Sequence, residues 1–137
     1  MKSLTYKAFL AVVVGIFLIL SAHSVFADSV SWQSYSDDAF ASARARQKLV
    51  LVYVNSESCH WCQRMNSESF ESPTIINLIS KKFIPVSVNI VRDRSIADSF
   101  GAYGTPTFIV LNGNQQEVSR LVGYQSPDQL IAFLNSL

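Results

Sequence analysis

The segment Cys59-His60-Trp61-Cys62 holds both cysteines of the 137-residue chain, separated by two residues. It follows a continuous apolar run, residues 49–54, and the polar loop NSES, and it opens a stretch without Gly or Pro. This pattern predicts a helix that begins at the cysteines. Free N–H groups and the positive end of the helix dipole stabilise an anion there, lowering thiol pKa values from about 8.5 to between roughly 3.5 and 7.5. We therefore expect Cys59 to be substantially ionised near neutral pH.

The spacing of the two cysteines suits a two-step thiol-disulfide exchange. Cys62 comes nearly one helical turn after Cys59, so the two sulfur atoms can meet while the first is more accessible. The Cys59 thiolate would attack a partner's disulfide and Cys62 would resolve the mixed disulfide, and the reverse sequence would donate a disulfide. This chemistry uses a redox-active disulfide and needs no metal or organic cofactor.

Two other uses of the cysteines stand beside the redox interpretation. A structural disulfide that closes four residues would contribute only about 2 kcal/mol. A metal site would need a third ligand, but the chain has no second CxxC and no histidine pair at finger spacing, and His23 lies in the N-terminal segment. The position of the pair after a buried strand favours redox chemistry over both alternatives.

The residues beside the cysteines have more than one possible role. His60, when protonated, can stabilise the neighbouring thiolate, or it can be a solvated residue on the outer side of the helix. Trp61 can offer partners an apolar contact next to the reactive sulfur, or it can pack locally on Met65. Arg64 adds a positive charge one turn further on, where exposed helix charges usually have no special role.

The N-terminal segment has the order of a secretory signal. Two lysines precede an uncharged run, residues 8–22, and small residues stand three and one positions before a cut after Ala27. Fifteen helical residues rise about 22 Å, short of the roughly 30 Å hydrocarbon core. We expect a signal peptide over residues 1–27 and one globular domain over residues 28–137, exported to a bacterial periplasm. The alternative is an uncleaved, tilted membrane anchor.

Composition limits the class of protein further. The chain is 49% hydrophobic, which excludes disorder, and eleven basic against ten acidic residues leave a net charge of +1. Because the chain has no basic run, a nucleic-acid partner is disfavoured. The residues after Ala27 are numerous enough to bury one hydrophobic core without disulfide cross-links.

Hydrophobic patterning after the N-terminal segment predicts alternating helices and strands. The strand over residues 49–54 should be central, because it is apolar without alternation. Pro85 lacks a backbone donor and argues that its strand lies at a sheet edge. Ile96, Phe100 and Tyr103 mark a short helix that ends near two glycines. The full set of expected elements is helices at 36–48, 59–69, from 72, near 96–103 and from 126, and strands at 49–54, 83–90, 107–111 and 117–122.

This order of elements predicts an α/β fold. A central mixed sheet is flanked by helices, and two short strands around Asn112-Gly113 form a hairpin that precedes the last helix. Whether the helix from residue 72 is separate or a kinked continuation of the cysteine helix is open.

The CxxC and a second, separate motif resemble the thioredoxin superfamily. Residues 103–137 repeat the family's second half: a Gly-x-Pro-Thr turn, a strand, an Asn-Gly hairpin, a strand ending in Gly and a final helix. The front half is similar to the exported branch related to thiol:disulfide interchange proteins, and the resemblance covers about residues 32–137. It implies a thioredoxin-like fold and an oxidoreductase whose partners are protein thiols and disulfides, with a membrane or periplasmic redox donor as a further candidate.

The resemblance also implies roles for individual residues. Cys59 would be the nucleophile and Cys62 the resolving thiol. The Thr105-Pro106 bond would be cis and face the cysteines, with the backbone of Thr105 pairing to an extended partner segment. Thr105 and Pro106 thus join Trp61 as candidate substrate-binding residues, and His60 is the candidate modulator of the thiolate.

Several departures from the family pattern leave the direction of exchange open. Tyr53 stands where thioredoxin has a buried acid, and a phenol titrating near 10 is a poor base at neutral pH. Ser58 replaces the usual Trp before the first cysteine, and His60 follows that cysteine, whereas oxidising exported members carry a His before the second. A reductase is slightly favoured over an oxidase. The competing class is a non-enzymatic binding module of the same fold, with a structural or metal-binding cysteine pair.

Overall fold

The computed structural model describes residues 29–137, and the signal peptide expected at residues 1–27 lies outside the described residues. Within the described part, every helix is too short or too polar to cross a membrane. The elements follow one another along the chain as β1 (Gln33–Ser34), α2 (Asp37–Arg46), β2 (Leu49–Asn55), α3 (His60–Glu68), α4 (Pro73–Lys82), β3 (Phe83–Asn89), α5 (Arg94–Ser99), β4 (Thr107–Leu111), β5 (Glu117–Val122) and α6 (Pro127–Asn135).

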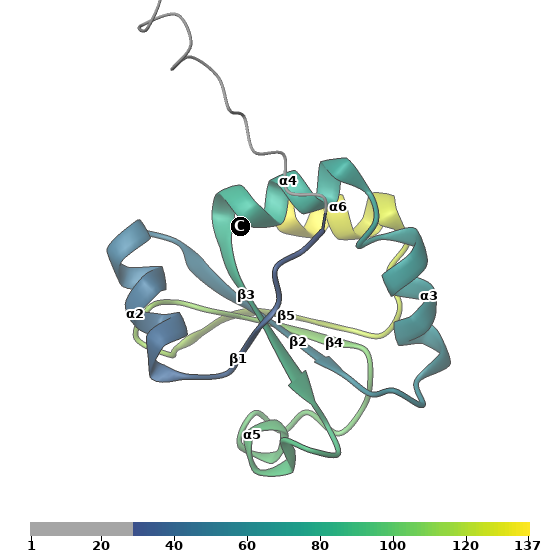
Figure 1. Ribbon diagram of the computed structural model, residues 1–137, viewed down its shortest axis with the longest axis horizontal. Coiled ribbons are helices and arrows are strands. Elements are labelled where there is room, and N and C mark those ends of the chain that lie inside the picture. The colour runs from purple at the N-terminus through teal and green to yellow at the C-terminus, as the bar shows by residue number, and fades with distance from the viewer. Residues whose placement is uncertain (1–28) are drawn as a thin grey trace, which may run out of the picture.

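The five strands form one mixed sheet in the order β1-β3-β2-β4-β5 (Figure 1). β2 is the central strand, parallel to β3 and antiparallel to β4, and β4 and β5 form the C-terminal hairpin. The apolar run of β2 is buried on both faces because neighbouring strands and helices cover it on every side. The predicted α/β fold with a mixed sheet flanked by helices is confirmed.

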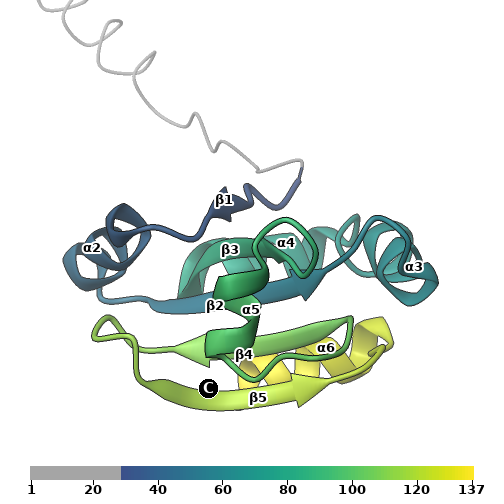
Figure 2. The ribbon, with the colours of Figure 1, turned by 90° about the horizontal axis from the view of Figure 1, so that it is seen from below.

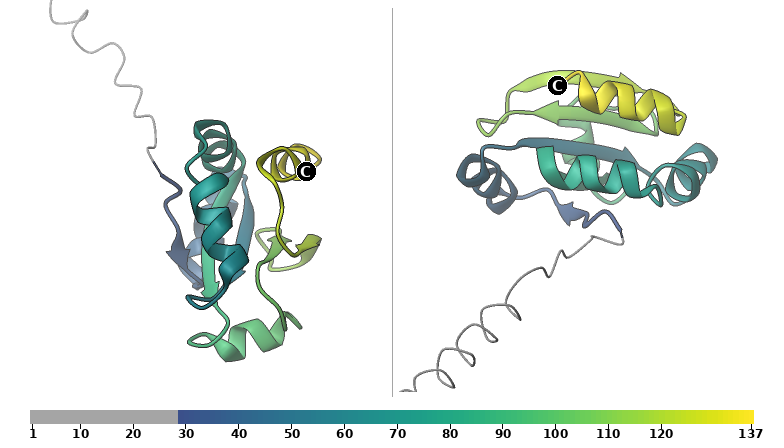
Figure 3. Two further views of the ribbon diagram at one scale, coloured as in Figure 1. Left: turned by 90° about the vertical axis from the view of Figure 1, so that its right-hand side faces the viewer. Right: turned by 90° about the horizontal axis from the view of Figure 1, so that it is seen from above.

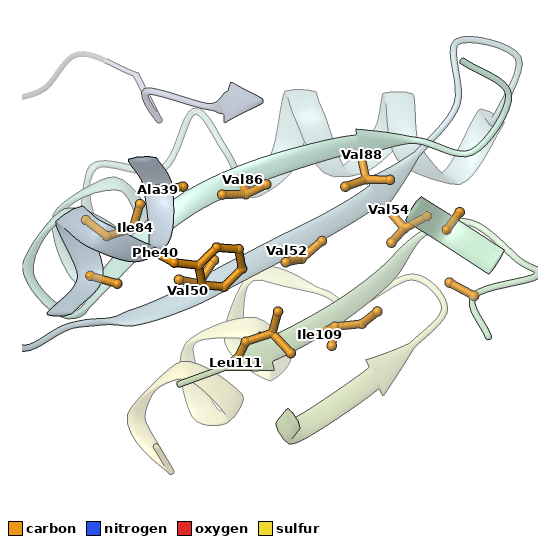
Figure 4. Packing of buried hydrophobic residues seen from close by; sticks show 13 residues of the cluster. Ala39, Phe40, Val50, Val52, Val54, Ile84, Val86, Val88, Ile109 and Leu111 are labelled. Carbon is orange, nitrogen blue, oxygen red and sulfur yellow. The ribbon is translucent and has the colours of Figure 1, made fainter. Parts of the chain in front are cut away.

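Helices cover both faces of the sheet. Alternate side chains of β2 point to opposite faces, so Val50 and Val52 enter one core cluster and Leu51 and Tyr53 enter the other. The first cluster lies under α2 and α5, and Figure 4 shows its valines and isoleucines along β2, β3 and β4. The second cluster lies under α3, α4 and α6, and Figure 3 shows α4 and α6 side by side over it. The second face is therefore the one that carries the cysteines.

The strand that contains Pro85 is not an edge strand, which corrects the prediction. β3 lies between β1 and β2. β1 has only two residues and pairs with Val86 and Ser87, so Pro85 faces no residue of β1 and its missing donor costs no ladder bond there. The outer strand itself was not predicted, because two residues are too few to show a periodic pattern.

The helix expected near residues 96–103 is shorter than predicted. α5 ends at Ser99, and Gly101 adopts the left-handed conformation with φ of 60°. The N–H of Ala102 donates to the carbonyl of Ala97 at 3.0 Å, which closes the helix end. Tyr103 therefore leaves the helix and is 82% exposed, so it does not belong to the apolar stripe that its spacing suggested.

The remaining helices begin where the sequence predicted. Ser36 and Ser126 cap α2 and α6 through their hydroxyl groups, and Ser126 forms a reciprocal capping box with Gln129. Pro73 opens α4 after a turn over residues 69–71 and the extended N-cap residue Ser72, so α4 is a separate helix and not a continuation of α3.

Candidate functional site

The cysteine pair lies at the N-terminus of α3, as the sequence predicted. Cys59 is the N-cap residue, and its backbone carbonyl accepts a hydrogen bond from the N–H of Gln63 at 3.1 Å. Its Sγ atom accepts a hydrogen bond from the backbone N–H of Cys62 at 3.1 Å. A sulfur atom thus occupies the position at which a Ser, Thr or Asp oxygen usually satisfies a free N–H group. The two cysteines form a disulfide with Cα atoms 5.2 Å apart.

The two cysteines differ in their exposure to solvent. Cys59 is half-buried, whereas Cys62 is 2% exposed and belongs to the core cluster that also holds Tyr53 and Met65. A large partner can reach Cys59 from outside but cannot reach Cys62 without moving the helix. The pair therefore consists of a partly exposed cysteine and a buried one.

Local hydrogen bonds hold the turn that leads from β2 into α3. The N–H of Cys59 donates to the carbonyl of Ser56 at 3.2 Å, and the Ser56 and Ser58 hydroxyl groups lie 3.0 Å apart. The amide of Gln63, in the first turn of α3, donates to the carbonyl of Glu57 at 3.0 Å. These contacts attach the loop to the helix that it precedes, so Cys59 is fixed from both sides.

The segment with Pro106 lies at the same end of the sheet as the cysteines. Val54, near the end of β2, pairs with Thr107, the first residue of β4. Cys59 follows β2 and Pro106 precedes β4, so both loops leave the sheet from this end, opposite the β4–β5 turn (Figure 2). Pro106 is buried, Thr105 is half-buried, and the bond between them is cis, as the resemblance implied.

His60 and Trp61 both lie on the outside of α3. His60 is exposed, and its ring is 5.7 Å from the Trp61 ring in an edge-on arrangement. Trp61 is 47% exposed and lies against the Tyr124 ring, at 5.2 Å between centroids. Met65 is fully buried in the core cluster, to which Trp61 does not belong.

The sequence analysis missed Tyr124 as a neighbour of the site. Its hydroxyl donates a hydrogen bond to Glu68, which also accepts from Arg64 Nε at 2.8 Å. The spacing of Arg64 and Glu68 on one helix was a readable signal of an ion pair. Nothing local could have connected them with a tyrosine that lies 56 residues further along the chain.

Tyr53 lies beneath α3 at the place of thioredoxin's buried acid. It is 3% exposed and stacks on Phe108 at 5.1 Å, and its hydroxyl has no hydrogen-bond partner within residues 29–137. Burial raises the pKa of Tyr53 above its ordinary value of 10.0, so the phenol stays neutral at physiological pH. No Asp or Glu within the described part of the chain is buried. A neutral hydroxyl therefore replaces an ionisable carboxyl in this core.

Metal-ligating side chains do not gather elsewhere in the described part of the chain. Within residues 29–137, no three His, Cys, Asp or Glu side chains lie close enough together to hold a metal ion. The two cysteines are thus the chemically distinctive feature of these described residues.

The fold and the site define a member of the thioredoxin superfamily of the thiol:disulfide interchange type. Residues 19–101 match the family described as Thioredox_DsbH, Protein of unknown function, DUF255, so the chain belongs to this family. It is 32% identical to a solved thioredoxin from Thermus thermophilus, over 79% of this chain and 86% of that one, with a TM-score of 0.70. The fold also matches a structure called DsbH Oxidoreductase, with a TM-score of 0.71 and 14% identity over 85% of this chain and 89% of that one.

Spermatogenesis-associated protein 20, a curated relative, is much longer than this chain. Spermatogenesis-associated protein 20 from Homo sapiens is 37% identical over 60 residues, which are 44% of this chain and 8% of that protein. The chain therefore matches one small part of that relative, and the activity of the whole relative does not transfer to it.

Proposed function

We propose that the protein is an exported thiol-disulfide oxidoreductase that exchanges disulfides with partner proteins through Cys59 and Cys62. The observation that carries the proposal is the position of the Cys59 sulfur. It accepts the N–H of Cys62 at the start of α3, and residue Cys59 is half-buried whereas Cys62 is buried. A thiolate formed at Cys59 would take the place of an N-cap oxygen and would be stabilised in the same way.

In the reducing direction, the Cys59 thiolate attacks one sulfur of the partner's disulfide. A mixed disulfide forms and the partner's other sulfur leaves as a thiolate, which takes up the proton of the Cys62 thiol. The Cys62 thiolate then attacks the Cys59 sulfur, so the Cys59–Cys62 disulfide forms and the second partner sulfur leaves. Two electrons pass to the partner, and a thiol reductant restores the pair. The oxidising direction runs the same steps in reverse.

Partner binding is assigned to the surface around the accessible sulfur. The backbone of Thr105 would pair with an extended segment of the partner, and the half-exposed Trp61 indole would contact residues beside the partner's cysteine. Support comes from the shared end of the sheet on which Cys59 and Pro106 lie. His60 is assigned a modulating role, because a positive charge next to a thiolate lowers the thiol pKa.

Catalytic turnover separates an enzyme from a binding module of the same fold. We expect the wild-type protein to accelerate reduction of insulin disulfides by dithiothreitol and Cys59→Ser to lose that acceleration. Cys62→Ser keeps the nucleophile but cannot resolve the mixed disulfide, so it should accumulate covalent adducts with partner proteins. Equal rates for wild type and Cys59→Ser, with no adducts, would leave a binding module as the function. Metal analysis of the reduced protein tests a metal-binding pair.

The direction of exchange and the export have their own measurements. A reductase is the favoured direction, and the redox equilibrium of the cysteine pair against glutathione tests it: a pair more reducing than glutathione fits a reductase, and a more oxidising pair fits an oxidase. Export is supported by the basic, apolar and small residues in residues 1–27. Mass spectrometry of the protein from its cells should find an N-terminus at Asp28, and an intact N-terminus would support the membrane anchor.

A further inference from the structure

Four side chains form a cluster on the outside of α3, and only one of them, Trp61, has a role in the proposed function. We call it the α3 clasp and define it as Trp61, Arg64, Glu68 and Tyr124. The first three lie on α3, and Tyr124 lies in the segment between β5 and α6, which runs beside α3 in Figures 1 and 2. The clasp thus joins two parts of the chain that are far apart in sequence.

Both ionic and aromatic contacts hold the clasp together. The Glu68 carboxylate accepts hydrogen bonds from both Arg64 and the Tyr124 hydroxyl. The Arg64 guanidinium lies 4.9 Å from the centre of the Tyr124 ring and 5.7 Å from that of Trp61, within the range of cation–π contacts. Because the Trp61 and Tyr124 rings also contact each other, the indole is held from two sides while half of its surface stays exposed.

The backbone next to Tyr124 is attached to the proline loop. The N–H of Gly123 donates to the carbonyl of Pro106 at 2.8 Å, and Gly123 adopts a φ of 89° that other residues rarely take. Gly123 is thus hydrogen-bonded to Pro106, and the next residue, Tyr124, contacts the outer face of α3 with its side chain. Those are the two segments to which partner binding is assigned.

We propose that Tyr124 is a positioning residue that fixes the Trp61 indole beside Cys59 and relative to the Pro106 loop. The clasp thereby favours an extended polypeptide whose residues beside the reacting disulfide are uncharged. This proposal rests on the proposed function and names the substrate class for the same site.

Charge and exposure around the clasp support an uncharged occupant. Arg64 and Glu68 are paired with each other, so the surface around the indole presents neither charge alone. A fixed aromatic ring binds an apolar or neutral residue without first losing rotamer freedom, which is how rigid aromatic anchors contribute to interfaces. A charged residue against the indole would lose hydration, and neither Arg64 nor Glu68 would be free to pair with it, because they are paired with each other. The indole is thus suited to select its partner by the residues that flank the cysteine.

The test compares two disulfide substrates on the same variants. The first is a disulfide-linked peptide with uncharged residues beside its cysteines, and the second is hydroxyethyl disulfide, which is too small to contact the clasp. For each variant the measured quantity is the ratio of kcat/KM for the peptide to kcat/KM for the small disulfide. We expect Tyr124→Ala to lower this ratio about fivefold through the peptide KM, with little effect on kcat. Tyr124→Phe keeps the ring but loses the hydrogen bond to Glu68, so its ratio should lie between those of wild type and Tyr124→Ala.

A matched control is available on the other face of the sheet. The Tyr35 hydroxyl donates to Gln115 at 3.2 Å, and its ring packs on Phe40 and Phe100, away from the cysteines. Tyr35→Phe also removes one phenol hydrogen bond and should leave the ratio unchanged. A drop of similar size in Tyr35→Phe would mean that the effect is general destabilisation, and it would overturn the positioning role.

Two further outcomes distinguish a failure of the proposed function from a failure of the role of Tyr124. If wild type does not react with hydroxyethyl disulfide, the proposed function fails. If wild type reacts but Tyr124→Ala keeps the wild-type ratio, only the role of Tyr124 fails. Should Tyr124→Ala not fold, Tyr124→Phe and Glu68→Ala decide, because both must lower the ratio. A peptide with glutamates beside its cysteines should show little dependence on Tyr124, and an equal dependence would refute the selection for uncharged segments.

Discussion

The two faces of the sheet are built from the same three strands but have different chemical character. The face under α2 and α5 is covered by aliphatic side chains of β2, β3 and β4, together with Phe40 (Figure 4). The face under α3, α4 and α6 holds Cys62 and Met65 with a group of aromatic rings. Because side chains alternate along a strand, neighbours in sequence serve different faces. One face therefore supplies packing alone, whereas the other also supports the helix that carries the cysteines.

The aromatic group beneath α3 consists of Trp32, Tyr53, Phe70 and Phe108. Tyr53 is stacked on Phe108, and Phe70 meets Tyr53 edge-on at 5.0 Å. Trp32 lies 5.1 Å from Phe70, so the segment next to β1 also contributes to this face. These rings share a core cluster with Cys62, whereas the other face holds the smaller group of Tyr35, Phe40 and Phe100. We expect changes in the aromatic group beneath α3 to reach the cysteines.

The largest expected effect comes from substituting two neighbouring residues of β4 whose side chains point to opposite faces of the sheet. Phe108 and Ile109 are both fully buried, but Phe108 belongs to the cysteine face and Ile109 to the aliphatic face. Phe108→Ala should lower the free energy of unfolding by about 3–5 kcal/mol and Ile109→Ala by about 2–5 kcal/mol. Only Phe108→Ala should also change the redox potential of the cysteine pair. Urea unfolding and equilibration with glutathione measure the two quantities, and equal potentials would remove the proposed distinction between the faces.

A smaller effect is expected at the hydroxyl of Tyr53. Because this buried hydroxyl lacks a partner, Tyr53→Phe should raise the free energy of unfolding at pH 7 by about 1–2 kcal/mol. Burial also raises the pKa of Tyr53 in the folded protein, so the unfolded chain loses this proton first and stability falls as the pH rises above about 10. Tyr53→Phe should remove part of that alkaline loss.

Urea unfolding of wild type and Tyr53→Phe at neutral and alkaline pH measures both effects. Tyr35 is half-buried on the other face, and Tyr35→Phe should not raise the stability at pH 7, because its hydroxyl has a partner. A loss of stability in Tyr53→Phe would show that the hydroxyl makes a bond in solution and that the cysteine face is more polar than described.

The smallest expected effect is the loss of stability on removing a helix N-cap, which we compare for one helix on each face of the sheet. Ser126 caps α6 and forms a reciprocal capping box with Gln129, whereas Ser36 caps α2 with a single side-chain bond. Ser126→Ala should cost about 1 kcal/mol of unfolding free energy, and Ser36→Ala should cost less. Thermal unfolding of the two variants measures the difference, and the reverse order would show that the capping box adds nothing.

Much of the fold could be predicted from local patterns. The apolar run of β2 predicted the central strand, Asn112-Gly113 predicted the hairpin, and Ser-Pro pairs predicted two helix starts. Features that depend on distant parts of the chain were missed. The two-residue β1 has no pattern of its own, and it is what makes the strand of Pro85 an inner one. Tyr103 had the spacing of a helical stripe, but Gly101 ends the helix before it.

The candidate site also has features that the sequence predicted and one that it did not. The position of Cys59 and Cys62 at a helix start followed from residue type, spacing and the preceding strand, and the cis bond at Pro106 followed from the family resemblance. The contact of Tyr124 with α3 could not be predicted, because it depends on how β5 and α6 place one side chain against a helix far away in sequence. Long-range side-chain contacts of this kind leave no periodic signal.

The most direct test of the account is the pKa of the Cys59 thiol in the reduced protein. In Cys62→Ala, Cys59 is the only thiol left in the chain, and the backbone N–H of residue 62 is retained, so a titration of ultraviolet thiolate absorbance reports on Cys59 alone. Cys59→Ala is the matched control, in which the buried Cys62 should titrate above about 8.5. The account predicts a Cys59 pKa clearly below about 8.5, and a value at or above that of a free cysteine would contradict it.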